Sequence, residues 1–263
     1  MTSIFSKLRQ RRQRNGGNPT SPAWWPYALV AVNLILIAFF TLDAPMGAYA
    51  THTPNMLLPI GEKVTDFARS GWILVVAGLL FLGALIYLRR PMPHRKRFKV
   101  IYTTHIAAYI FLSVAISSLI ANILKIAIGR ARPTQYEEWE TFGFLPFHGD
   151  FNFESFPSGH STVAGAFMTA LALLLPRYRV FFLIAGLWLG MARVIIGVHY
   201  PSDVFAGLSF GAWTAFITAV MFSRYGLLFS FTAGRLPRLR RPLKFRPTQP
   251  SGHSGKRPLH QDA

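Results

Sequence analysis

Long apolar stretches alternate with short basic segments along the chain. A helix that crosses the hydrocarbon core of a bilayer needs about 20 apolar residues, and six stretches approach or reach that length. They are Trp24–Leu42, Gly71–Leu88, Val100–Leu124, Ser161–Leu175, Val180–Val198 and Val204–Phe222. The fourth is short unless its helix begins near Ser158. The pattern predicts an all-α, polytopic membrane protein with six transmembrane helices in one bundle.

The basic residues between these stretches are unevenly distributed. Five precede the first stretch, six separate the second from the third, two separate the fourth from the fifth, and nine follow the sixth. Because Lys and Arg in short loops mark the cytoplasmic side, both termini are expected there. Cytoplasmic segments at residues 1–23 and 225–263 then flank a transmembrane domain at residues 24–224. The second segment is basic and rich in Pro, and is expected to be disordered.

The composition supports a membrane protein and argues against several other classes. Only 14% of the residues are charged, against roughly 25% in an ordinary soluble domain. The net charge of +18 suggests nucleic-acid binding, but the bases lie between apolar stretches, so no nucleic-acid partner is expected. The chain has no cysteine, which excludes disulfides, thiol catalysis and Cys-based zinc sites.

The first apolar stretch also needs comparison with a signal peptide. A basic segment precedes it, and Ala48-Tyr49-Ala50 resembles a cleavage site. However, the apolar part of a signal peptide has about 7–15 residues, and Trp24–Leu42 is longer. An uncleaved membrane anchor is therefore the favoured interpretation.

Charged residues are costly at membrane depth and mark functional sites there. At the end of the third stretch, Lys125 and Arg132 are seven residues apart, which places them within roughly 20° of each other on a helix. Both can face one anion, and Pro133 ends the helix beside them. Arg130 lies off this face and is expected only to extend toward lipid head groups.

Ser158, Gly159 and His160 precede the fourth stretch. Ser caps helices, Gly lets a ligand approach the backbone, and a helix N-terminus offers free N–H groups to an anion. His160 is placed where it can donate a proton. A plain capped helix with an interfacial His is an equally good interpretation of this segment alone.

At the junction of the fifth and sixth stretches, Arg193 lies within apolar sequence and His199 precedes Pro201. Pro201 suits the first turn of a helix, so Asp203 lies in that turn, four residues after His199. Its carboxylate can accept from one imidazole nitrogen and leave the other free. The alternative is a structural Asp–His pair beside an Arg that extends outward.

All three groups lie at the outer junctions of the predicted topology. Three cations, two imidazoles and a carboxylate on one rim suit phosphoryl transfer, in which fixed charge holds phosphate, one His attacks and the other protonates the leaving oxygen. The residues alone do not assign the two histidines. A metal site of both histidines and Asp203 is less favoured, because neighbouring cations repel a dication. Neither a metal nor a cofactor is expected.

The three groups resemble the type 2 phosphatidic acid phosphatase (PAP2) family and its vanadium haloperoxidase relatives. The family pattern reads Lys-x6-Arg-Pro, then Pro-Ser-Gly-His, then Ser-Arg-x5-His-x3-Asp. It is matched in order by Lys125, Arg132, Pro133, Pro157, Ser158, Gly159, His160, Arg193, His199 and Asp203. The resemblance extends from the third stretch to the sixth and implies the same six-helix bundle.

The resemblance assigns a role to each matched residue. It implies that His199 is the nucleophile and forms a phosphohistidine, that Asp203 orients it, and that His160 is the general acid. The residues implied to hold the phosphate are Lys125, Arg132, Ser158, Gly159 and Arg193. Ala192 stands where the pattern has Ser, so one hydroxyl contact is lost and weaker phosphate binding is expected.

A site on the outer rim of the membrane indicates a lipid phosphate as substrate. The compact basic sequence is typical of a bacterial inner-membrane protein whose site faces the periplasm. A lipid A phosphate is favoured, and undecaprenyl pyrophosphate, phosphatidylglycerol phosphate and phosphatidic acid are the alternatives. A lipid phosphotransferase, or a protein that binds or transports lipid phosphates without chemistry, uses similar residues. No obligate protein partner is expected.

Overall fold

The fold is a bundle of helices. The computed structural model describes residues 9–13, 23–52, 70–232 and 236–241. The helices are α2 (Trp25–Thr41), α3 (Asp43–His52), α5 (Ser70–Tyr87), α6 (His94–Ile128), α7 (Tyr136–Trp139), α8 (Gly159–Leu174), α9 (Arg179–Ile195) and α10 (Pro201–Arg224). Within the described residues, the strands are one antiparallel pair, β1 (Phe229–Ser230) and β2 (Arg238–Leu239). The all-α prediction is confirmed.

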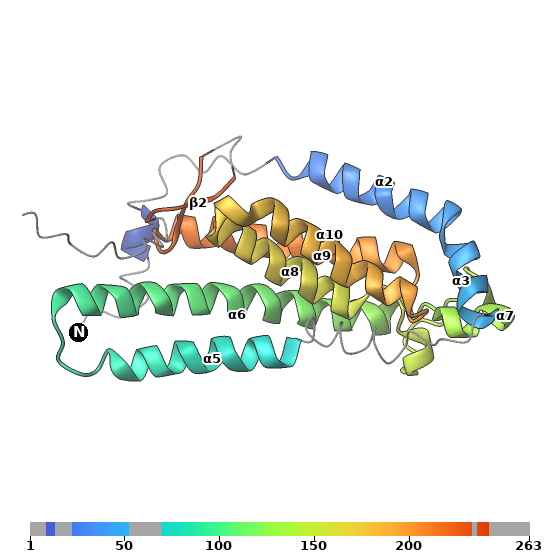
Figure 1. Ribbon diagram of the computed structural model, residues 1–263, viewed down its shortest axis with the longest axis horizontal. Helices are drawn as coiled ribbons and strands as arrows, with labels where there is room; N and C mark the ends of the chain where they lie inside the picture. The colour runs from blue at the N-terminus through green and yellow to red at the C-terminus, as the bar shows by residue number, and fades with distance from the viewer. Residues whose placement is uncertain (1–8, 14–22, 53–69, 233–235, 242–263) are drawn as a thin grey trace, which may run out of the picture.

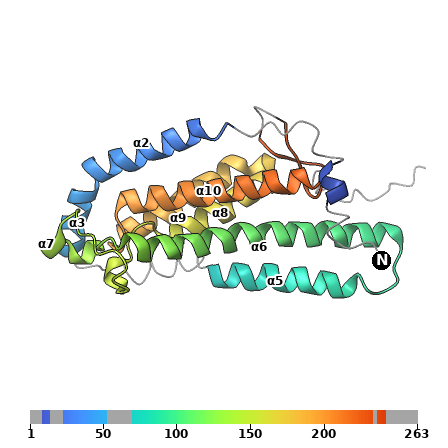
Figure 2. The ribbon, with the colours of Figure 1, turned by 180° about the vertical axis from the view of Figure 1, so that it is seen from behind.

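The long helices lie side by side along the length of the molecule (Figure 1). Helix α8 packs against α6, α9 and α10, and α5 packs along α6. Helix α2 lies over α10 and continues, after a bend, into α3 at the end of the bundle where α7 also lies (Figure 2). This end gathers the termini of several helices and is called the α3 end below.

The predicted spans correspond to helices of unequal length. Four helical segments of the described residues are long and apolar enough to cross a membrane. They are α5, α6, α10 and residues Pro176–Ile195, which include α9. The pair of α2 and α3 passes the same test together but is bent by 50°. Helix α8 begins at Gly159, close to the predicted start, yet has only 16 residues. The chain is a multi-pass membrane protein, and the count of six spans stays a prediction.

Helices α8 and α10 contact each other through glycines. A Cβ added at Gly211 would lie 2.0 Å from the carbonyl oxygen of Thr162, and one at Gly165 would lie 2.3 Å from that of Leu208. Only a residue without a side chain fits such backbone contacts. This close approach sets the N-terminus of α8 beside the N-terminus of α10.

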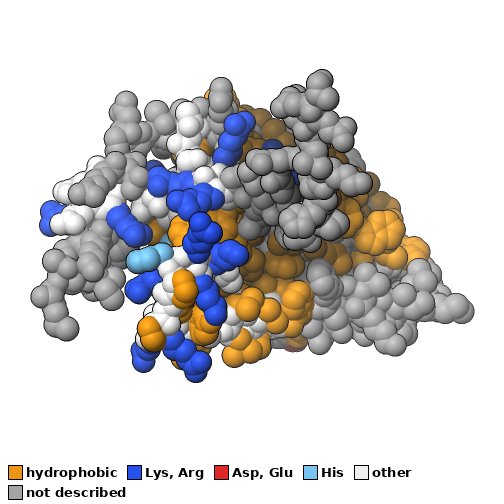
Figure 3. All heavy atoms as spheres, turned by 60° about the vertical axis from the view of Figure 1, so that its left-hand side comes forward, with side chains coloured by type: hydrophobic (Ala, Val, Ile, Leu, Met, Phe, Trp, Pro, Cys, Tyr) orange, Lys and Arg blue, Asp and Glu red, His pale blue; other side chains and the backbone are white. Residues whose placement is uncertain are grey.

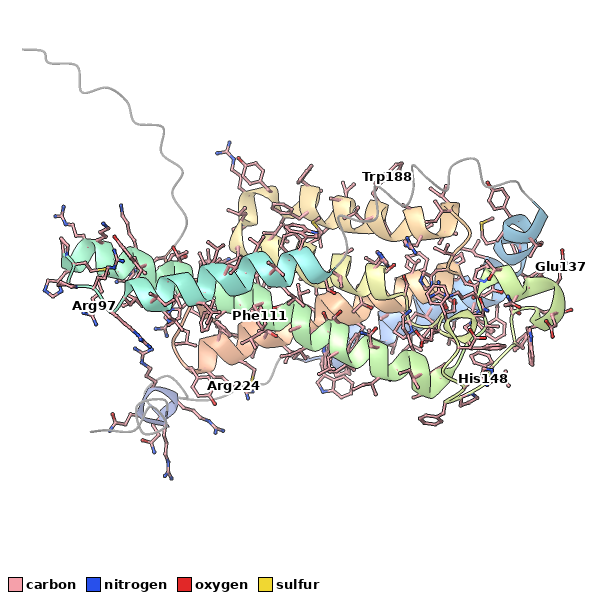
Figure 4. All side chains as sticks on the ribbon, turned by 90° about the horizontal axis from the view of Figure 1, so that it is seen from below. Arg97, Phe111, Glu137, His148, Trp188 and Arg224 are labelled. Atoms are coloured by element: carbon pink, nitrogen blue, oxygen red, sulfur yellow. The ribbon has the colours of Figure 1, made fainter. Side chains whose placement is uncertain are left out.

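Charges separate along the bundle. Arg97 and Arg224 lie toward one end of the molecule, while Glu137 and His148 lie at the α3 end (Figure 4). Lys and Arg side chains crowd the first of these ends, beside exposed hydrophobic ones (Figure 3). The distribution agrees with the sequence pattern behind the predicted orientation, which itself stays a prediction.

The start of the C-terminal segment is folded, contrary to the expected disorder from residue 225. Leu228 and Phe229 are fully buried, and the ring of Phe229 lies edge-on to Tyr109 with centroids 4.8 Å apart. The Tyr102 hydroxyl donates to the carbonyl oxygen of Arg241 over 2.6 Å. Apolar residues of this segment pack against the bundle, which explains the difference. The rest of the expected tail, residues 242–263, and residues 1–8 and 14–22 of the N-terminal segment lie outside the described residues.

Candidate phosphate-binding active site

Three junctions between helices bring the predicted site residues together at the α3 end. Helix α6 ends at Gly129, whose φ of 62° is left-handed, and a Cβ there would lie 1.9 Å from the carbonyl oxygen of Leu145. Arg132 is extended before Pro133, as expected for a residue preceding proline. Lys125 in the last turn of α6 and Arg132 beyond it therefore reach the same region.

A cavity of about 750 Å³ lies at these junctions between helices. Six of the eight predicted site residues line it, namely Lys125, Arg132, Gly159, His160, Arg193 and His199. Polar side chains of Ser118 and Asn122 on α6 also line it, together with Trp72 of α5. The three cations and two imidazoles thus face one space, as the sequence predicted.

Backbone carbonyls hold two of the cations in place. The Lys125 ammonium donates to the carbonyl oxygen of Glu154 over 2.9 Å. The Arg132 Nε donates to that of Phe151 over 2.9 Å, and its guanidinium lies 3.8 Å from the centre of the Phe151 ring. Both side chains are buried. Preorganised positive charge of this kind binds an anion without having to be ordered first.

His199 is positioned as a neutral imidazole. It is buried, and its Nδ1 lies 3.6 Å from Oδ2 of Asp203. Burial lowers the pKa of His199 to about 3, against the opposing effect of the Asp203 hydrogen bond. With Nδ1 turned to the carboxylate, Nε2 is the nitrogen left for the cavity that His199 lines. An unprotonated ring nitrogen can act as a nucleophile.

Asp203 lies behind the cavity and is fully buried. It occupies the first turn of α10, where Oδ2 accepts from the Tyr200 backbone N–H over 3.0 Å. The Ser155 hydroxyl donates to the same oxygen over 2.6 Å and lies 3.5 Å from Nδ1 of His199. Ser155 is a site residue that the sequence did not reveal, because it lies outside the recognised spacings.

Ser158 and Ala192 do not line the cavity. The Ser158 hydroxyl caps α8, accepting from Ser161 N and Ser161 Oγ over 3.5 and 2.9 Å. Gly159, by contrast, faces Lys125, whose Cε would lie 3.5 Å from an added Cβ. Ser158 thus orients the helix terminus, and direct contact of its hydroxyl with phosphate stays a prediction. Ala192 is buried in α9, directly before Arg193, which lines the cavity, and the weaker phosphate binding expected from the missing hydroxyl stays a prediction.

The expectation for Arg130 is wrong. Its side chain is only 1% exposed and forms ion pairs with Asp203 and Asp43 over 2.5 and 2.8 Å. A cation with two buried carboxylate partners has no need of lipid head groups. Asp43 lies 87 residues away in the sequence, and no local spacing connects the two.

A space walled by fixed cations at the end of apolar helices suits an anionic phosphate on a lipid. The chain belongs to the PAP2 superfamily, whose model matches residues 106–227, and the protein is a membrane-bound phosphatase. All three sequence motifs fall within that range. The resemblance seen in the sequence is therefore confirmed.

Two curated relatives share most of the chain. Lipid A 1-phosphatase of Rhizobium johnstonii is 42% identical over 241 residues, covering 92% of this chain and 98% of that protein. Lipid A 1-phosphatase of Rhizobium etli is 43% identical over 218 residues, covering 83% and 93%. A crystal structure of the PAP2-type phosphatidylglycerolphosphate phosphatase of Bacillus subtilis has a TM-score of 0.49 and 21% identity, covering 74% of this chain and 91% of that one.

Proposed function

We propose that this protein hydrolyses a phosphate ester of lipid A at the periplasmic face of the bacterial inner membrane, through a phosphohistidine on His199. The observation that carries the proposal is the buried, neutral His199 at a cavity walled by Lys125, Arg132 and Arg193. The names of the two Rhizobium relatives favour lipid A among lipid phosphates. Ser118 and Asn122 also line the cavity, and their side chains can form hydrogen bonds with a polar group attached to the phosphate.

The first chemical step forms the phosphohistidine. The three cations and the Gly159 backbone N–H hold the phosphate oxygens. Nε2 of His199 attacks phosphorus, a P–N bond forms, and the P–O bond to the lipid breaks. His160 gives its proton to the departing lipid oxygen. Asp203 stabilises the positive charge that develops on the imidazole, and the fixed cations stabilise charge on the phosphoryl oxygens.

The second step releases phosphate. His160, now neutral, takes a proton from water as the water oxygen attacks phosphorus. The P–N bond breaks, and its electron pair returns to Nε2 of His199. Both histidines then have their starting protonation states, so the cycle balances. The three cations stabilise the negative charge on the phosphoryl oxygens at both steps.

Phosphate release from pure lipids tests the proposal. The purified protein in detergent is given lipid A, phosphatidic acid, phosphatidylglycerol phosphate or undecaprenyl pyrophosphate, with and without EDTA. We expect the highest kcat/KM on lipid A, no effect of EDTA, and loss of release in His199→Ala. A clear preference for another lipid would contradict the substrate. Tight binding of lipid A without phosphate release would instead favour a binding or transport protein.

A further inference from the structure

A buried ionic cluster lies behind Asp203, on the side away from the cavity. Arg130 donates from Nη1 to Asp203 Oδ1 over 2.5 Å and to Ser202 Oγ over 2.7 Å. From Nη2 it donates to Asp43 Oδ2 over 2.8 Å. The exposed fractions of Asp43, Arg130, Ser202 and Asp203 are all 0 or 1%. One guanidinium thus spans two carboxylates in a site closed to water.

Asp43 is held as firmly as Arg130. Its Oδ1 accepts from the Ser202 backbone N–H over 3.0 Å, and its Oδ2 also accepts from the Ser202 hydroxyl. Aromatic rings of Phe39 and Tyr200 lie 4.9 and 4.4 Å from the Arg130 guanidinium carbon. These contacts fix the orientations of the Asp43 carboxylate and the Arg130 guanidinium. The start of α3, the segment after α6 and the first turn of α10 are joined at one point.

The two carboxylate oxygens of Asp203 have different partners. Arg130 occupies Oδ1, which leaves Oδ2 for Ser155, the Tyr200 N–H and His199. Without Arg130, Oδ1 would lose its charged partner, and only the contacts of Oδ2 would orient the carboxylate. A partner that orients the residue behind a nucleophile fixes the direction and the basicity of that residue, as outer-shell partners do for metal ligands.

The charges of the cluster also matter to the reaction. Asp43 and Asp203 carry two negative charges and Arg130 one positive charge, so one negative charge is in excess. When His199 attacks phosphorus, its imidazole becomes positive and this excess offsets it. Removing the charge of Asp43 would leave Arg130 paired with Asp203 alone and so reduce the negative charge that Asp203 presents to the imidazole.

We propose that Arg130 and Asp43 are positioning residues for the nucleophile, acting through Asp203. Asp43 lies outside residues 106–227, which the superfamily model matches, so the bent α2–α3 segment contributes to a site built otherwise from the helices after it. The inference rests on the proposed attack by His199.

The test removes the charge of Asp43 and keeps the size and shape of its side chain. Asp43→Asn should lower kcat by about 10- to 100-fold, while KM and the affinity for inorganic phosphate stay close to the wild-type values. Asp43→Glu, which keeps the charge, should recover part of the lost kcat. Glu138→Gln, an exposed acid of α7 at the same end, is the matched control and should leave kcat unchanged.

The outcomes separate this inference from the proposed function. A wild-type enzyme with turnover whose Asp43→Asn variant keeps its kcat would overturn the inference alone. Equal losses of kcat and phosphate affinity in Asp43→Asn, without recovery in Asp43→Glu, would also overturn it by showing general damage. A wild-type protein that cleaves none of the lipid phosphates would overturn both proposals.

Discussion

The protonation of His199 decides at which pH the nucleophile is available. Burial lowers its pKa to about 3, so the imidazole is neutral through the physiological range, where an ordinary His titrates near 6.5. In NMR spectra, the imidazole signal absent from His199→Asn should titrate far below pH 6.5. Titration of that signal near 6.5 would show that His199 is not buried as described.

The same shift has a consequence for stability. The unfolded chain takes up the His199 proton as the pH falls below about 6.5, while the folded chain resists uptake until about pH 3. His199 is neutral in both states above pH 6.5 and has no pH-dependent effect there, but the folded state becomes progressively less stable relative to the unfolded state as the pH falls from about 6.5 toward 3. His199→Asn should flatten the fall in melting temperature over this window.

Ser155 is the second residue whose role can be measured. Its hydroxyl donates to Asp203 Oδ2 over 2.6 Å, and a hydrogen bond to a charged group contributes about 1.5–3 kcal/mol. Ser155→Ala should therefore lower kcat by about 10- to 100-fold. Ser223→Ala, which removes a buried hydroxyl from the far end of α10, should leave kcat unchanged. Equal kcat values in both variants would contradict a role for Ser155.

The residues that could be predicted are those that a helix or a turn brings together. The seven-residue step from Lys125 to Arg132 and the four-residue step from His199 to Asp203 are fixed by local geometry. Arg130, Asp43 and Ser155 could not be predicted. Their partners come from other elements, and only the packed fold determines that they meet.

At the scale of elements, the contact of α8 with α10 sets the distance between the two histidines. Gly211→Ala would place a Cβ 2.0 Å from the Thr162 carbonyl oxygen. We expect the variant to lose about 1–3 kcal/mol of stability or more and to lose activity as α8 shifts. Gly83→Ala in α5, where an added Cβ meets nothing within 4 Å, is the control and should be tolerated. Thermal unfolding and phosphate release measure both effects.

Helix positions were predictable because apolar stretches have to be long to cross a bilayer. The start of α8 near Ser158 followed from capping chemistry, and the structure begins α8 at Gly159. The bend between α2 and α3 was not predicted, although Pro45 follows it directly and proline breaks or bends helices. The burial of Asp43 at this bend has no local signal in the sequence, because its partner is the distant Arg130.

For the whole molecule, orientation in the membrane is a prediction that single cysteines can test. The chain has no cysteine of its own, so Arg97→Cys and Glu137→Cys report each end separately (Figure 4). A membrane-impermeant maleimide should label Glu137→Cys in intact spheroplasts, and Arg97→Cys only after lysis. Both side chains are exposed, so labelling reports membrane side. The reverse labelling would contradict a periplasmic site.

The central claim is that His199 carries the phosphoryl group between lipid and water. Rapid quenching of the purified enzyme during turnover of lipid A with a radiolabelled phosphate, followed by mass spectrometry, tests it directly. We expect an acid-labile phosphate on His199, absent from His199→Ala and reduced in Asp43→Asn. Phosphate on another side chain, or turnover that persists in His199→Ala, would contradict the account.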